Sequence, residues 1–225
     1  MALNLLPFRQ YDENDVVNLF AFSPAVALAD TTTDGQASQG SIVKIAGGNF
    51  NQDLITYGSD SYLGKTDYPF VAGDMYPTNS LLITGCGADE NASAVLGVTL
   101  NQTAKNDENG EKLLYNATKK EELQAVLPGQ SVPVATKGIF TFAESAFTNN
   151  SFANVAIGGG IATAAAGKIT GVALGTTGQD GVLASTSRSI LGQVIGTVIG
   201  TGERVSQNSS LTDQFAGKFA IVKLG

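Results

Sequence analysis

The chain has 225 residues, of which 43% are hydrophobic, only 15% are charged and 27 are glycine, a composition that favours a strand-rich structural protein with a neutral polar surface. Its 13 Lys and Arg against 20 Asp and Glu give a formal net charge of −7, which argues against nucleic-acid binding because phosphate recognition needs clustered basic residues. The absence of histidine excludes Ser-His-Asp and Cys-His nucleophiles and His-ligated metals, and the single Cys86 excludes an internal disulfide and a Cys-rich zinc site.

Residues 1–29 form a distinct opening segment that begins with MALNLLPFRQY. No basic region precedes the first apolar residues, so the pattern does not indicate a signal peptide. Pro7 restricts the residue before it to extended backbone. We therefore predict an extended N-terminal arm that leads into a first strand. Should this arm bind a partner, the side chains best suited to the contact are Leu3, Leu5, Leu6, Phe8, Arg9 and Tyr11.

Residues 30–148 are predicted to form a β-barrel-like domain. The segment 30–40, DTTTDGQASQG, has the composition of a loop, and Pro128-Gly129 is expected to form a turn between two later strands. Runs rich in β-branched and aromatic residues, bounded by turn residues, predict strands. These strands are expected at residues 40–45, 80–84, 94–100, 123–127, 131–136 and 138–143.

Charge is concentrated between residues 101 and 122, where nine of 22 residues are charged. This density predicts a solvated loop between strands. Thr118 and Glu121 have the spacing of a capping box and could begin one helical turn; a second short helix is considered at 142–147. Oxygen ligands alternate along 107–111, but the remaining ligands of a calcium-binding loop are missing, so a solvated acidic loop is preferred there.

Residues 149–225 are predicted to form a glycine-rich β subdomain packed on the preceding domain. Residues 192–201 resemble 167–176, shifted by 25 positions. Glycine within a strand marks a bulge, a bend or a close approach of another backbone, so the two copies predict similar, bent strands. Strands are expected here at residues 153–157, 168–174, 189–200 and 215–224.

The stretch ILGQVIGTVIGTG carries Gly192, Gly196 and Gly200 at the four-residue spacing that packs membrane helices. A spanning helix needs about 20 consecutive apolar residues, and this run is interrupted by Gln193 and ends before Glu203. No membrane span is therefore predicted. Its Val and Ile residues favour a strand instead, on which glycines four apart would share one face.

These patterns together predict an all-β protein, with one or more compact barrel-like or sandwich-like domains, an extended N-terminal arm and little helix. AAAGKIT at 164–170 lacks the first glycine and the Ser or Thr of a phosphate-binding loop. No motif for a cofactor, a metal or a catalytic group is recognised, and we do not expect an enzyme.

Three stretches resemble the head decoration, or cement, proteins of tailed bacteriophages. They are the opening MALNLLPFRQYDENDVVNLFAF, the strand–turn–strand pattern QAVLPGQSVPVATKGIFTF and the closing GKFAIVKLG. The resemblance covers about a quarter to a third of the chain, and these motifs are less specific than a metal or nucleotide signature.

The resemblance implies a β-rich protein on the outer surface of a phage capsid, assembled in the cytoplasm of the bacterial host. Its partner would be the major capsid protein, and it would join neighbouring capsomers as a homo-oligomer, with a trimer favoured and a dimer possible. Neither nucleic acid nor membrane is expected as a partner. The family supplies no catalytic residues.

Two arrangements are open for the opening segment. It could leave its own domain to contact the shell, in which case deleting residues 2–11 should leave a folded protein that binds more weakly. Ordering a free eleven-residue arm costs roughly 11–22 kcal/mol, whereas burying its four large apolar side chains contributes roughly 6–12 kcal/mol. Alternatively, it packs on its own domain as an edge strand.

Two further functions are considered. A fibre or adhesin module that binds a host glycan would use exposed aromatic residues, for which the candidates are Tyr57, Tyr62, Tyr68 and Tyr76. A hydrolase working with carboxylates alone ranks third, because no pair of acidic residues is singled out by the sequence.

Overall fold

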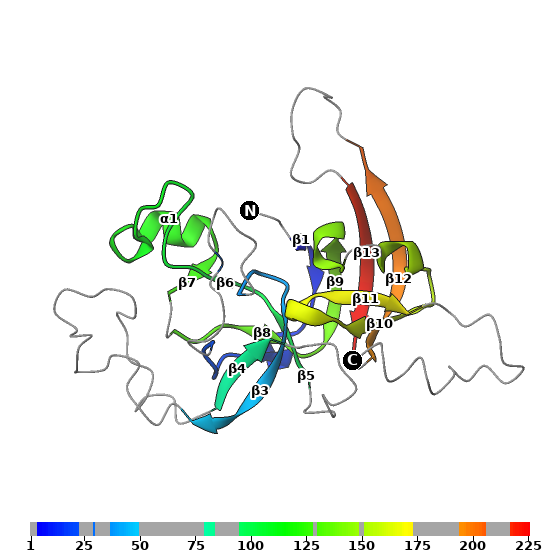
Figure 1. Ribbon diagram of the computed structural model, residues 1–225, viewed down its shortest axis with the longest axis horizontal. Helices are drawn as coiled ribbons and strands as arrows, with labels where there is room; N and C mark the ends of the chain where they lie inside the picture. Colours follow the sequence, from blue (N-terminus) through cyan, green and yellow to red (C-terminus); the bar gives the residue numbers. More distant parts are fainter. Residues whose placement is uncertain are drawn as a thin grey trace, which may run out of the picture. The chain divides into compact units, whose positions relative to one another are not determined.

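The computed structural model describes residues 4–22, 29, 37–49, 79–83, 95–127, 130–148, 151–172, 194–205 and 217–225 (Figure 1). Within these ranges the chain forms thirteen strands, one α-helix and five short 3-10 helices. The predicted all-β fold with little helix is confirmed. The chain divides into two compact units, one holding β2 to β8 with α1 and the other holding β1 and β9 to β13.

The second unit contains a six-stranded antiparallel sheet in the order β1-β9-β13-β12-β10-β11. Apolar residues alternate along β9 and β13, which places Phe140 opposite Val222 and Phe142 opposite Ala220 on a fully buried face. In Figure 1 the β10–β11 hairpin runs across the direction of β12 and β13. The strands are β1 (Leu5–Gln10), β9 (Gly138–Ala143), β10 (Gly160–Thr163), β11 (Ile169–Val172), β12 (Val194–Arg204) and β13 (Gly217–Leu224).

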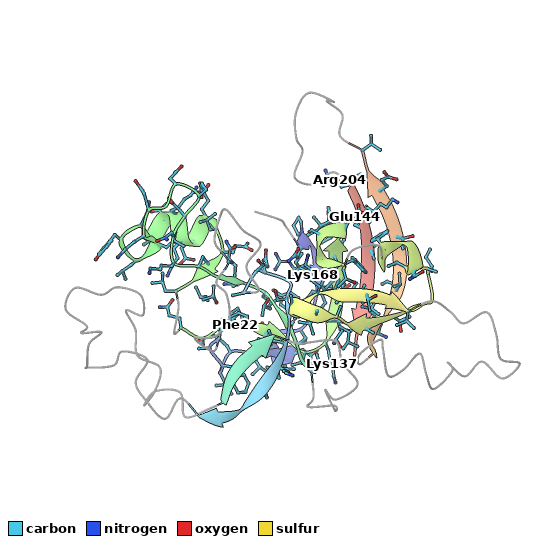
Figure 2. The ribbon with its side chains drawn as sticks, in the orientation of Figure 1. Phe22, Lys137, Glu144, Lys168 and Arg204 are labelled. Carbon is cyan, nitrogen blue, oxygen red and sulfur yellow. The ribbon has the colours of Figure 1, made fainter. Side chains whose placement is uncertain are left out.

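Short 3-10 helices accompany these strands. The helix expected at 142–147 is a single 3-10 turn, and Glu144 within it lies beside β13 (Figure 2). Its carboxylate accepts a hydrogen bond from the Lys218 backbone N–H at 3.5 Å. The four turns are η1 (Glu13–Asp15), η3 (Glu144–Ala146), η4 (Ser151–Asn154) and η5 (Ala165–Gly167).

The first unit contains a five-stranded sheet in the order β2-β8-β5-β3-β4. Its core includes Phe22, labelled in Figure 2, which packs with Ala37, Val43, Val132 and Val134. Apolar side chains at these positions drive the packing because their burial removes hydrocarbon surface from water. The strands are β2 (Val16–Val17), β3 (Ile42–Asn49), β4 (Asn79–Ile83), β5 (Val95–Thr99) and β8 (Val134–Ala135).

The charged segment at 101–122 is more ordered than a solvated loop. Leu113 is fully buried, and it packs with Ala29, Ala104, Ala125 and Leu127 in a small core of its own. Hence the charged segment contributes residues to an apolar cluster that sequence reasoning missed, because the members of the cluster are spread over nearly 100 positions. The elements are β6 (Gln102–Thr103), η2 (Leu113–Tyr115), α1 (Ala117–Glu122) and β7 (Ala125–Val126), with β6 and β7 parallel.

Helix α1 begins two residues earlier than the predicted capping box implies. Its N-cap is Asn116, not Thr118, and the Asn116 side chain accepts a hydrogen bond from the Lys119 backbone N–H at 3.1 Å. Asparagine is among the best N-cap residues because its short side chain reaches the unpaired amide groups of the first turn. The predicted capping box is therefore wrong, although a single short helix is present.

Most predicted strands lie where the sequence places them. The strand at 138–143 coincides with β9, and those at 80–84 and 94–100 differ from β4 and β5 by one residue at each end. The predicted strand at 153–157 is wrong, since residues 151–154 form η4. Strand β10 begins only at residue 160, after the chain turns through Gly158, whose positive φ of 85° interrupts extended backbone.

The two glycine-containing repeats form strands on either side of β10. Ile161 of β10 lies opposite Gly171 of β11 and opposite Gly196 of β12, and these two glycines are the equivalent positions of the repeats. An added Cβ at Gly171 would come within 2.9 Å of backbone atoms of Asn154 and Val155, and one at Gly196 within 2.5 Å of the Lys223 carbonyl oxygen. The missing side chains therefore leave room for neighbouring backbone, as predicted for glycine within a strand.

Gly196 and Gly200 do not share a face of β12. Gly196 lies opposite Leu224 and Val198 opposite Val222, but the register then shifts, so that Gly200 lies opposite Ile221. One extra residue in a strand moves every following side chain to the other face. The prediction of a common face is therefore wrong for this pair; Gly192 lies outside the described residues.

The predicted domain boundaries at residues 29 and 148 differ from the two compact units. Strands β1 and β9, which precede residue 148, belong to the same sheet as β12 and β13, and Figure 1 shows β9 and β13 side by side. The predicted boundaries were drawn from local composition, which gives no information on pairing between strands that are distant in sequence.

Candidate partner-binding strand

Strand β1 contains most of the predicted contact residues, and it is an edge strand of the six-stranded sheet. Leu5 lies opposite Phe142 of β9, and Arg9 lies opposite Phe140. The Ala143 backbone N–H also donates a hydrogen bond to the Asn4 carbonyl oxygen at 3.0 Å. Of the two arrangements open for the opening segment, the structure therefore has the one in which it packs on its own domain.

The predicted contact residues separate into a buried pair and an exposed group. The side chains of Leu5 and Leu6 are 1% and 3% exposed, so in this conformation they cannot contact a partner. Their burial stabilises the second unit by about 1.5–3 kcal/mol each. Phe8 is 68% exposed and Tyr11 41% exposed. Leu3 lies outside the described residues.

An irregularity in β1 separates the buried pair from the exposed group. Leu5 and Arg9 are four positions apart in β1, whereas their partners Phe142 and Phe140 are only two positions apart in β9. Pro7 lies within this bulge, as expected for a residue that has no backbone N–H and is tolerated in strands at edges and bulges. The bulge explains why Leu6, next to Leu5, is also buried while Phe8 points to solvent.

Arg9 and Tyr11 are held by the sheet. Arg9 is half-buried, and its burial lowers the pKa of the guanidinium from its ordinary value, an effect opposed by the nearby Tyr11. The Tyr11 ring stacks on the buried Phe140 ring with centroids 5.8 Å apart and an interplanar angle of 14°. Gly138 of β9 lies close to the backbone of β1, since an added Cβ at Gly138 would come within 2.8 Å of the Gln10 carbonyl oxygen. Arg9 and Tyr11, two of the predicted contact residues, thus also have structural roles.

Other exposed apolar side chains are not predicted from the sequence. Among the described residues they are Ile157, Ile199 and Val205 in the second unit and Leu19 and Tyr115 in the first. Hydrophobicity alone could not identify them, since Ile199, for example, directly follows the buried Val198. Tyr115 is 76% exposed and ends the 3-10 helix η2, next to the cap of α1.

The acidic turn at 107–111 is closed by its own first residue. One Asp107 carboxylate oxygen, Oδ1, accepts hydrogen bonds from the backbone N–H groups of Asn109 at 2.9 Å and Glu111 at 2.8 Å. Asp107 is buried, in contrast to the predicted solvated loop, while Glu108 and Glu111 are exposed. A short side chain that hydrogen-bonds amides two and four residues later holds a tight turn.

Several residues considered from the sequence lie outside the described ranges: Tyr57, Tyr62, Tyr68, Tyr76, Cys86 and the Pro128-Gly129 turn. In the described part of the chain, no three His, Cys, Asp or Glu residues are grouped so as to hold a metal ion. Among the same residues, no helix combines the length and the apolar character needed to cross a membrane.

Comparisons of the chain with protein-family models, with curated proteins and with solved structures gave no match.

Proposed function

We propose that this chain is a virion structural protein that binds the outer surface of a tailed-phage capsid and joins neighbouring capsomers, without enzymatic activity. Its partner is the major capsid protein, and it acts as a homo-oligomer, a trimer being favoured over a dimer. The proposal rests on the resemblance of three stretches to head decoration proteins, to which the all-β fold is suited.

One observation carries the proposal: the opening stretch of the resemblance presents two exposed aromatic residues, Phe8 of β1 and Tyr11 just after it, from a segment that is already ordered. Two buried leucines hold this strand on its sheet, while Phe8 and Tyr11 remain in contact with solvent. A free arm would lose about 1–2 kcal/mol of conformational entropy for each residue ordered on binding. A strand held on its own sheet does not incur that cost at the interface, so its exposed side chains contribute more of their burial to affinity.

The test is co-sedimentation of the purified protein with expanded phage heads stripped of their decoration. We expect saturable binding to stripped heads and none to heads that retain their decoration. The absence of saturable binding to stripped heads would refute the proposal. Deleting residues 2–11 is no longer an informative variant, because it removes an entire strand and two buried leucines and should destabilise the second unit by roughly 3–6 kcal/mol from those two side chains alone.

A glycan-binding fibre or adhesin module is the second candidate. The observation that favours it is Tyr115, an aromatic residue of the first unit that is 76% exposed. Exposed aromatic side chains offer a large, rigid contact surface at small entropic cost. A glycan array separates the two functions: binding to a defined glycan that is lost in Tyr115→Ala, without binding to stripped heads, would establish the second candidate.

A further inference from the structure

The edge of β1 that lies away from β9 is poorly suited to pairing with a strand of another protein. An added strand needs a regular row of backbone donors and acceptors in constant register. In β1, Pro7 lacks the backbone N–H, and the bulge between Leu5 and Arg9 changes the register in the middle of the strand. Proline and bulges are devices that prevent edge-to-edge pairing. A partner that contacts β1 must therefore recognise its side chains.

Phe8 is the side chain that β1 offers for such recognition. Phe8 is 68% exposed, although it lies within the six-residue strand β1. The residues on either side of it are held in place by contacts with the sheet. On one side Leu5 and Leu6 are buried, and on the other side Tyr11 stacks on Phe140. The backbone on both sides of Phe8 is thus anchored before any partner binds. A preorganised aromatic side chain is typical of the few residues that dominate binding energy at protein interfaces.

We infer that Phe8 is the principal anchor of this protein on the capsid, inserting its ring into an apolar pocket of the major capsid protein, and that β1 does not bind by strand addition. The inference rests on the proposed function. Among the described residues of the second unit, the other exposed large hydrophobic side chains are Tyr11, whose ring is stacked on Phe140, and the aliphatic Ile157, Ile199 and Val205, which lack the large contact area of an aromatic ring. Because the contact is apolar, its strength should depend little on ionic strength.

The test measures the affinity for stripped heads of three variants that should fold normally. Phe8→Ala should weaken binding by about 30-fold or more, the loss that defines an interface hot spot. Phe8→Leu should retain part of the affinity, because leucine fills part of an apolar pocket. Ile157→Ala, a matched truncation of another exposed apolar residue in the same unit, should bind like the unaltered protein. Thermal unfolding midpoints of all three should remain near that of the unaltered protein, because both positions are exposed.

Pro7→Ala distinguishes the two modes of recognition, because it supplies the missing backbone N–H. Tighter binding by Pro7→Ala, together with an unchanged affinity of Phe8→Ala, would overturn the inference and indicate strand addition. An equal loss in Phe8→Ala and Ile157→Ala would also overturn it, by indicating a diffuse apolar contact. If the unaltered protein binds stripped heads but Phe8→Ala binds equally well, the inference fails and the proposed function stands. If the unaltered protein does not bind, both fail.

Discussion

Gly196 occupies a point of β12 at which no side chain fits beside β13. An added Cβ would lie 2.5 Å from the Lys223 carbonyl oxygen and 3.0 Å from side-chain atoms of Leu224 and Val222. A backbone oxygen within a hydrogen-bonded sheet cannot move away as a flexible side chain can. At Gly200, on the opposite face, the nearest atom is the Cδ1 of Ile221 at 3.3 Å, the flexible end of a side chain.

Gly196→Ala should therefore lower the free energy of unfolding by about 1–3 kcal/mol, the usual cost of overpacking. Gly200→Ala should change it by less than about 1 kcal/mol, because slight crowding is offset by the smaller entropy of the unfolded chain. Urea unfolding of the two variants, four residues apart on one strand, provides the comparison. Equal effects would contradict the assignment of the two glycines to opposite faces.

Helix α1 is tied to the acidic turn by the ion pair between Lys119 and Glu108. Lys119 also lies 3.4 Å from the Glu122 carboxylate. The hydrogen bond with Lys119 lowers the pKa of Glu108 from its ordinary value of 4.5, and the hydrogen bond with Glu108 raises the pKa of Lys119 from 10.5. Glu108 contributes to stability above pH 4.5, and this contribution is lost as the pH falls through its lowered pKa. Lys119 contributes to stability below pH 10.5, and this contribution is lost as the pH rises through its raised pKa.

Lys119→Met should return the pKa of Glu108 toward its ordinary value, because the methionine side chain keeps the hydrocarbon length and removes the charged donor. An NMR titration of the Glu108 side-chain carboxyl measures the change. Lys120→Met is the matched control, since Lys120 pairs with Glu121 instead. A Glu108 pKa that stays low in Lys119→Met would contradict the proposed cause. Because exposed ion pairs contribute little to folding, the titration is a sharper measurement than thermal stability.

The two compact units are interleaved along the chain, so neither is a single continuous segment. The chain forms β1 of the second unit, then β2 to β8 of the first, and returns to the second unit with β9. Strand β13 is paired on one side with β12 and on the other with β9, from which it is separated by more than 70 residues. The sheet of the second unit therefore depends on both ends of the chain.

A fragment comprising residues 149–225 should not fold alone, because it lacks β1 and β9 and with them the buried Phe140 and Phe142. Circular dichroism and amide NMR dispersion of the fragment measure this directly. Mixing it with a fragment comprising residues 1–148 should restore a folded sheet, because the β9–β13 pairing needs no covalent connection. A well-dispersed spectrum of 149–225 alone would show that its strands form an independent domain.

The sequence by itself determined the all-β class, the positions of most strands and the equivalent glycine positions within two similar strands. These properties depend on neighbouring residues: β-branched and aromatic side chains with alternating polarity favour strands such as β9 and β13, and glycine shows where a side chain is not tolerated. The equivalence of Gly171 and Gly196 was visible in the sequence for the same reason, although their common neighbour Ile161 was not.

Only the tertiary structure decided which strands pair, and therefore which side chains of the opening segment are buried and which are exposed. Six positions between Leu3 and Tyr11 were indistinguishable as contact residues from the sequence, yet Leu5 and Leu6 are buried and Phe8 is exposed. That separation depends on the pairing of β1 with β9, more than 120 residues away, and on a bulge that changes which face each following side chain occupies. Neither long-range hydrogen bonding nor the place of an extra residue in a ladder is encoded in local periodicity.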